Sequence, residues 1–164
     1  MKRILFVFAV LFSTAVFRVQ AESLNPQDRE IVAACLVLEA GGEGFDGMRA
    51  VLNVMLNRAK GDLGRLVSAT VKRGAFSCMA SIWNQEEPDY SPLIDRAMNQ
   101  PEAYAGASQL LDTLEQGLLT DNTGGATHYH ADYILPYWAD SLHFLTAIGS
   151  HRFYTERAPG TASI

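Results

Sequence analysis

The chain has 164 residues and a formal net charge of −5 at pH 7, and it is long enough for one domain with a hydrophobic core. The first 21 residues contain three basic residues and no acidic ones, so the charge becomes −8 without them. Non-specific binding to nucleic acid needs clustered lysine and arginine. The acidic composition therefore argues against a nucleic-acid partner.

The N-terminus has the pattern of a secretory signal. Two basic residues precede an apolar stretch from Ile4 to Phe17, and small residues occupy positions 19 and 21. The stretch is too short to span a membrane, and no later segment approaches that length. We therefore predict a signal peptide over residues 1–21 and an exported mature domain over residues 22–164, without a membrane span. Its expected location is the periplasm, the cell envelope or the extracellular space.

Two helices are expected at the start of the mature chain. Asn25-Pro26 is a favourable helix start, because asparagine caps free N–H groups and proline suits the first helical position. This helix is apolar on nearly all sides from Ile31 to Leu38, as in a buried core helix, and it stops at Gly41-Gly42. Asp46 can cap a second helix over residues 47–59, where apolar side chains recur at helical spacing.

The remaining elements alternate with turn signals. We expect a short helix and then an extended stretch at 75–78, helices over 92–100 and 101–119, a turn cluster at 121–126, and strands over 127–133 and 144–154 with a hairpin turn at Gly149-Ser150. These elements predict an α+β domain that is mainly helical, with a small C-terminal antiparallel sheet.

Cys35 and Cys78 are the two cysteines of the chain. Export permits a disulfide between them. Cys35 lies inside the apolar helical run, where a free cysteine acts as a small hydrophobe. We favour two buried thiols, with a bridge as the alternative.

Glu39 ends the apolar run of the first helix. Its place on the helical wheel falls between Val32 and Cys35, on an apolar face at the negative end of the helix dipole. Burial and the dipole both disfavour a carboxylate there, which suits a group that must hold a proton as a general acid. Glutamine at this position is expected to be equally or more stable. A solvated helix end is the alternative, and Glu43 is either a second catalytic carboxylate or a polar neighbour that orients Glu39 or a loop.

All four histidines lie in the last quarter of the chain, and His128 and His130 share one face of an expected strand. Such a pair can begin a zinc site, but no HExxH motif and no cysteine pair with metal-ligand spacing accompanies it. We expect no metal and no cofactor, and interpret these histidines as sugar-contacting or structural.

Aromatic side chains gather in the loop and sheet region, with Phe76, Tyr129 and Trp138 among them. Rings beside polar groups suit a carbohydrate cleft, where they stack on sugar faces. The alternative is that half or more of them fill the core. Ser77 is a weak candidate for a nucleophile, because GAFSCM is not a nucleophile elbow.

Five segments in order resemble the SleB-like cell-wall hydrolases, a family that includes spore-cortex-lytic enzymes. They are EAGGE, VLNVMLNR, GAFSC, GATHYHADYILPYWA and IGSHRFY, within residues 28–155. The resemblance implies a lysozyme-like α+β domain that cleaves peptidoglycan glycan strands between N-acetylmuramic acid and N-acetylglucosamine by lytic transglycosylation. It places the acid/base on Glu39 and the second glutamate of the motif on Glu43. Gly41 stands where the family usually has arginine, which puts any salt bridge of that arginine in doubt.

We therefore predict a monomeric, exported peptidoglycan-cleaving enzyme with Glu39 as its acid/base. Further candidates for the substrate cleft are Glu43, Asn57, Ser77, His128, Tyr129 and Trp138. One alternative is a water-using muramidase with a second carboxylate from Glu43, Asp46 or Asp132, since classical glycosidases need a pair. The others are a non-catalytic peptidoglycan-binding or germination-accessory protein on the same fold and, last, a zinc amidase.

Overall fold

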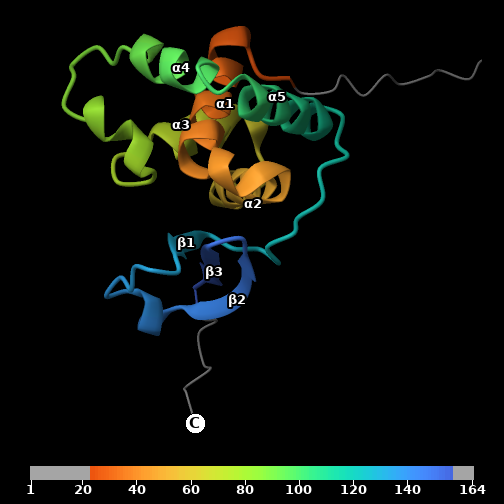
Figure 1. Ribbon diagram of the computed structural model, residues 1–164, viewed down its shortest axis with the longest axis vertical. Helices are drawn as coiled ribbons and strands as arrows, with labels where there is room; N and C mark the ends of the chain where they lie inside the picture. The colour runs from red at the N-terminus through yellow and green to blue at the C-terminus, as the bar shows by residue number, and fades with distance from the viewer. Residues whose placement is uncertain (1–22, 157–164) are drawn as a thin grey trace, which may run out of the picture.

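The computed structural model describes residues 23–156, which form a layer of helices beside a small sheet (Figure 1). The helices are α1 (Pro26–Ala40), α2 (Gly44–Arg58), α3 (Leu66–Val71), α4 (Ser91–Met98) and α5 (Pro101–Glu115), and the strands are β1 (His128–Ala131), β2 (His143–Ile148) and β3 (His151–Thr155). The expected class, a mainly helical α+β fold with a C-terminal antiparallel sheet, is confirmed. The predicted signal peptide, residues 1–21, lies outside the described residues. Within residues 23–156 no helix combines the length and apolar character needed to cross a membrane.

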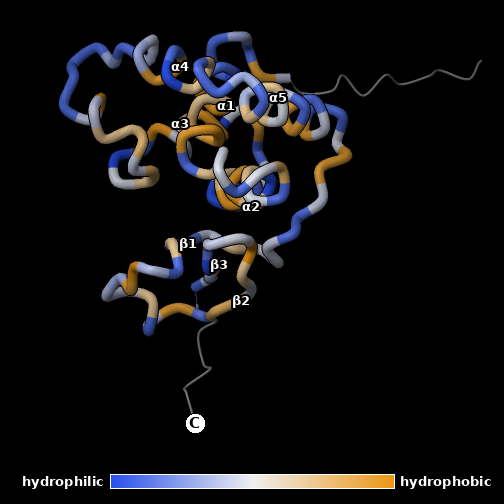
Figure 2. Tube along the Cα trace, viewed as in Figure 1, coloured by the Kyte–Doolittle hydropathy of each residue, from blue (hydrophilic) through white to orange (hydrophobic). Residues whose placement is uncertain are grey.

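Helix α1 is the core of the helical layer. Its side chains from Ile31 to Val37 are all buried, as the continuous apolar run predicts. The Asn25 side chain accepts a hydrogen bond from the Asp28 N–H at 2.8 Å and so caps the helix start. Arg29 donates to Glu115 on α5 at 2.8 Å, which ties the two helices together. Hydrophobic residues, coloured orange in Figure 2, gather inside this layer, whereas the outer loop before α4 is hydrophilic.

A tight junction joins α1 to α2. A 3-10 turn over Gly41–Glu43 runs directly into α2, which starts at Gly44 with a left-handed φ of 70°. The prediction that Asp46 caps the second helix is wrong, because this turn starts the helix earlier. Asp46 lies instead in the first turn of α2, where its carboxylate is 3.1 Å from the Arg49 guanidinium.

The sheet has the strand order β1-β3-β2, and both pairings are antiparallel. Gly149-Ser150 forms the turn between β2 and β3, as predicted. Phe153 on β3 is fully buried against Ala50 and Val54 of α2. This small second core holds the sheet against the helical layer.

Two predicted boundaries are wrong. The segment 75–78 is extended only at Phe76, and a 3-10 helix over Ser77–Ser81 follows, which buries Met79 in the main core. Helix α5 ends at Glu115 rather than at 119, because Gly117 adopts a φ of 70° and the Leu118 N–H bonds back to the Thr113 carbonyl.

Cys35 and Cys78 are free thiols with their sulfur atoms 3.3 Å apart. Cys35 is buried as predicted, whereas Cys78 is only half-buried. Burial raises the pKa of the Cys35 thiol well above its usual value, and so does its hydrogen bond with Cys78. The contact joins α1 to the 3-10 helix that also reaches Glu39.

Candidate active site

Glu39 occupies the second-last position of α1 and accepts three hydrogen bonds. Its Oε1 accepts from the Ser77 hydroxyl at 3.0 Å and from the Cys78 main-chain N–H at 2.8 Å. Its Oε2 accepts from the Tyr129 hydroxyl at 2.7 Å. The carboxylate is half-buried and Ser77 is exposed, so the site opens to solvent. Three donors from two distant segments fix the orientation of this carboxylate.

Tyr129 brings the sheet to Glu39. It lies on β1, and its ring packs at 6.3 Å from the Phe76 ring, 5.7 Å from Phe153 and 5.1 Å from His151, between ring centroids. Burial, together with the charge and hydrogen bond of Glu39, raises the pKa of the Tyr129 hydroxyl well above its usual value. The hydroxyl therefore stays protonated and available as a donor across the neutral range.

Arg58 is not among the predicted site residues, yet it links the two segments that carry the donors to Glu39. Its Nε donates to the Thr127 carbonyl at 2.6 Å, and its Nη1 donates to the Ala75 carbonyl at 3.1 Å. Its guanidinium lies 4.9 Å from the centre of the Phe76 ring. Sequence reasoning missed it because a basic residue in the last turn of a helix is already explained by the helix dipole.

Asn57 holds the loop that leads into β1. Its side-chain amide donates to the Ala126 carbonyl at 3.0 Å and to Asp121 at 3.3 Å. One turn earlier, Asn53 donates to the Thr120 carbonyl at 3.1 Å. Burial raises the pKa of Asp121, but hydrogen bonds from Thr123, Gly125 and Asn57 outweigh it and lower the pKa overall. The structure places Asn57 in a loop anchor and not at the Glu39 carboxylate.

Glu43 anchors the hairpin between β2 and β3. Its carboxylate accepts from the Ser150 N–H at 2.8 Å and from the Ser150 hydroxyl at 2.5 Å. Hydrogen bonds from the Ser150 side chain and main chain lower the pKa of Glu43. A side chain at Gly149 would overlap the Glu43 carboxylate, so glycine is required there by space as well as by its φ of 56°. Glu43, itself part of the α1–α2 junction, thus ties that junction to the sheet.

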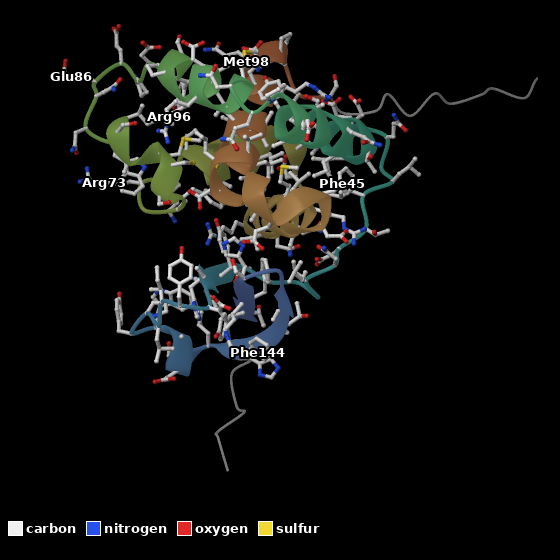
Figure 3. All side chains as sticks on the ribbon, viewed as in Figure 1. Phe45, Arg73, Glu86, Arg96, Met98 and Phe144 are labelled. Carbon is white, nitrogen blue, oxygen red and sulfur yellow. The ribbon has the colours of Figure 1, made fainter. Side chains whose placement is uncertain are left out.

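His128 and Trp138 lie together, away from Tyr129. Adjacent residues of a strand point to opposite faces, so His128 projects from the face of β1 opposite to Tyr129. Its ring is 5.6 Å from Trp138, which also packs at 5.8 Å against Tyr154. The structure therefore does not bring these two candidates to Glu39. Phe144 lies still farther out, on the side of the sheet away from the helices (Figure 3).

His130 uses both ring nitrogens inside the protein. Its Nδ1 is 2.8 Å from the Ala131 carbonyl, so this nitrogen carries the proton, and its Nε2 accepts from the Tyr154 hydroxyl at 2.9 Å. Among residues 23–156 no three His, Cys, Asp or Glu side chains gather in a way that could hold a metal ion. Of the two histidines predicted on one face of the strand, His128 packs against Trp138 and His130 is hydrogen-bonded to Ala131 and Tyr154.

The aromatic residues divide between core and surface. Phe76 and Phe153 are buried beside Tyr129, whereas Tyr133 and Tyr137 are 81% and 97% exposed. The exposed tyrosines lie on the loop after β1, together with Leu135 at 77%. Only part of the aromatic cluster is therefore available to stack on a ligand.

The geometry around Glu39 suits reversible proton transfer. The Cys78 N–H can only donate, so Oε1 must remain an acceptor. The Tyr129 hydroxyl at Oε2 can either donate or accept, because it carries one proton and free lone pairs. A protonated Glu39 thus carries its proton on Oε2, and a charged Glu39 regains the tyrosine donor.

Comparison with known proteins gives the family. The sequence model described as "Cell Wall Hydrolase" matches residues 42–154, and the chain belongs to this family. The match starts after Glu39 and includes all three of its donors. The fold is similar to the catalytic domain of the germination-specific lytic transglycosylase SleB from Bacillus anthracis, with a TM-score of 0.58 at 21% identity, over 80% of this chain and 97% of that one. The fold is thus lysozyme-like, as expected. A search of curated protein sequences finds no significant match.

Proposed function

We propose that this protein cleaves peptidoglycan glycan strands between N-acetylmuramic acid and N-acetylglucosamine by lytic transglycosylation, with Glu39 as the acid/base. The observation that carries the proposal is the Glu39 carboxylate, half-buried at the end of the core helix and held by three donors. Family membership and the fold shared with a lytic transglycosylase point to the same substrate class.

Glu39 acts twice in the proposed reaction. As an acid it gives its Oε2 proton to the glycosidic oxygen, so that the bond to C1 of the muramoyl residue breaks. As a base it then takes the proton of that residue's own C6 hydroxyl while the C6 oxygen bonds to C1. The products are a free 4-hydroxyl on one fragment and a 1,6-anhydromuramoyl end on the other. The reaction consumes no water, and it needs no second carboxylate.

The partners of the other carboxylates support this route over hydrolysis. A hydrolase needs a second carboxylate that binds water or forms a covalent intermediate. Glu43 is engaged by Ser150, and Asp46 by Arg49. Asp132, the remaining candidate, follows β1 on the exposed loop. Glu43 and Asp46 thus have partners within the fold, and the partners of Glu39 itself are hydroxyls and a main-chain N–H.

The proposal includes export as a monomer that needs no cofactor. Peptidoglycan lies outside the cytoplasmic membrane, so an enzyme that acts on it must be exported. The predicted signal peptide over residues 1–21 would direct that export. Sequencing of the secreted protein should find Glu22 at its N-terminus. A secreted protein that begins at Met1 would contradict this part.

Mass spectrometry of digested peptidoglycan tests the reaction directly. The wild-type protein should release muropeptides with anhydro ends, and Glu39→Gln should release almost none. Reducing ends instead of anhydro ends would identify a water-using muramidase. Wild-type protein that binds peptidoglycan but releases nothing would identify a non-catalytic binding protein.

A further inference from the structure

A basic cleft lies beside the Glu39 site of this acidic protein. It has a volume of about 760 Å³ and is bounded by the end of α2, α3 and the start of β1. Glu156 is its one acidic lining residue, against five basic ones: Arg58, Lys60, Arg65, Lys72 and Arg73. In a chain with a net charge of −5, this clustering on one concave surface creates a local positive field.

Two of the five cations are not used within the fold. Arg58 is committed to main-chain carbonyls, and Arg65 pairs with Asp62 at 2.9 Å. Arg73 donates to Asn84 at 3.0 Å and projects at the rim of the helical layer (Figure 3). Lys60 and Lys72 are exposed and have no ion-pair partner in residues 23–156. Their charges therefore face the cleft uncompensated.

The backbone conformation of Lys60 also distinguishes this residue from the other cations of the cleft. Lys60 has a φ of 59°, and it is the one residue other than glycine with positive φ in residues 23–156. It follows the end of α2, a position that strongly favours glycine, and Gly61 comes next. The αL conformation closes the end of α2, where the Lys60 N–H bonds to the Asn57 carbonyl and the Gly61 N–H to the Leu56 carbonyl. Lysine at this position, unlike glycine, adds an ammonium group to the lining of the cleft.

The cleft and the Glu39 site are built from the same two chain segments, although Glu39 and its three donors do not line the cleft. Ala75 lines the cleft and lies two residues before Ser77, which donates to Glu39. His128 also lines it and directly precedes Tyr129. Arg58 bonds to the carbonyls of Ala75 and Thr127, which both line the cleft. Two residues of chain span at most about 7 Å, so a polymeric ligand bound at Glu39 is long enough to reach the cleft.

We propose that the basic cleft is a subsite for a carboxylate carried by the glycan strand, with Lys60 and Lys72 as its binding residues. The inference rests on the proposed function and names what the strand must carry. The sugars N-acetylglucosamine and N-acetylmuramic acid are neutral apart from the lactyl carboxyl, which is either free or substituted by a peptide that bears its own carboxylates. Lysine suits such a ligand as a point charge at a solvated surface.

Steady-state cleavage of three substrates tests the subsite: peptide-bearing strands, the same strands with amidated carboxyls, and strands stripped of peptide so that the lactyl carboxylate is free. Wild-type protein should have a KM for amidated strands roughly 3- to 10-fold above that for the strands that carry the bound carboxylate, with kcat unchanged. The preference should weaken as salt is raised. Stripped strands distinguish the two sources: a low KM for stripped strands alone identifies the lactyl carboxylate as the ligand, and a low KM for peptide-bearing strands alone identifies a carboxylate of the peptide.

The double variant Lys60→Gln/Lys72→Gln should raise KM for the charged strands by the same factor and lose the preference over amidated ones. The matched control is Arg96→Gln/Arg152→Gln, which removes two exposed charges that do not line the cleft. The control should keep both KM and preference. Equal KM values for all three substrates in the wild-type protein would overturn the subsite alone. A wild-type protein that cleaves none of the three would overturn the proposed function and the subsite with it.

Discussion

Glu39→Gln separates the chemical role of this carboxylate from its structural one. Glutamine keeps the size of the side chain but has no transferable proton. The loss of a general acid lowers the rate by at least roughly 10²-fold. We expect kcat for release of muropeptides to fall by that factor, with little change in the affinity for uncleaved strands.

The stability of Glu39→Gln follows from the three donors. Sequence reasoning predicts equal or greater stability, because burial and the helix dipole both disfavour a carboxylate at the end of α1. In the structure the carboxylate accepts from Ser77, Cys78 and Tyr129. A hydrogen bond to a charged acceptor is worth about 1 kcal/mol more than a neutral one, so neutralisation costs about 3 kcal/mol. Relief of the dipole and of burial returns about 1–2 kcal/mol.

The net expectation is a loss of about 1–2 kcal/mol in the free energy of unfolding, which reverses the sign expected from sequence. Urea unfolding at pH 7 measures it, and Tm should fall by about 3–6 °C for a domain of this size. Glu30→Gln is the matched control, because Glu30 is an exposed glutamate on the same helix. It should leave activity and stability unchanged.

Two results would refute this reasoning separately. Wild-type rates of muropeptide release by Glu39→Gln would remove Glu39 from the chemistry. An increase in stability would show that burial and the dipole outweigh the three donors, and that the carboxylate is held at a cost in the folded protein.

Three further predictions concern the groups around Glu39. Arg58→Met should lower kcat roughly tenfold and the free energy of unfolding by about 2–4 kcal/mol, because two main-chain carbonyls lose a charged donor; kinetics and urea unfolding measure both. Cys78→Ala should keep kcat within about twofold, since its donor to Glu39 is the main-chain N–H, whereas Ser77→Ala should lower kcat by several-fold; equal losses would contradict the assignment of donors. Ser150→Ala should destabilise the protein by about 1 kcal/mol at pH 7. The hydrogen bonds of Ser150 to charged Glu43 lower the pKa of that carboxyl in the folded state. Their contribution to stability is therefore complete above the usual value of 4.5 and is lost as pH falls through the lowered pKa. The urea midpoints of the wild-type protein and Ser150→Ala should accordingly converge in acid.

Local sequence patterns were sufficient to predict the elements of the fold. The Asn25 cap, the all-apolar run of α1 and the Gly149-Ser150 turn depend on neighbours in the chain, and the structure contains all three. The errors lie where tertiary contacts decide. Met79 enters the main core through a 3-10 turn, although its segment has the composition of a strand.

The site was predicted only in part, for the same reason. Glu39 broke a local rule of helix ends and could be singled out from sequence. Ser77 and Tyr129, both predicted as cleft residues, are brought to its carboxylate by contacts across 38 and 90 residues. No local rule marks Arg58, because its two acceptors are main-chain carbonyls that every residue offers.

The position of the acid at the junction of two layers explains why so many polar bonds surround it. The donors to Oε1 come from the helical layer, and the donor to Oε2 comes from the sheet. A shift of the sheet would therefore move one donor and leave the others. Further polar links cross the same junction, among them Arg58 to Thr127, Asn57 to Ala126 and Glu43 to Ser150. Because the apolar contact between the layers is small, these links must fix the distance from Tyr129 to Glu39, and residues that never touch substrate thereby determine how the acid is held.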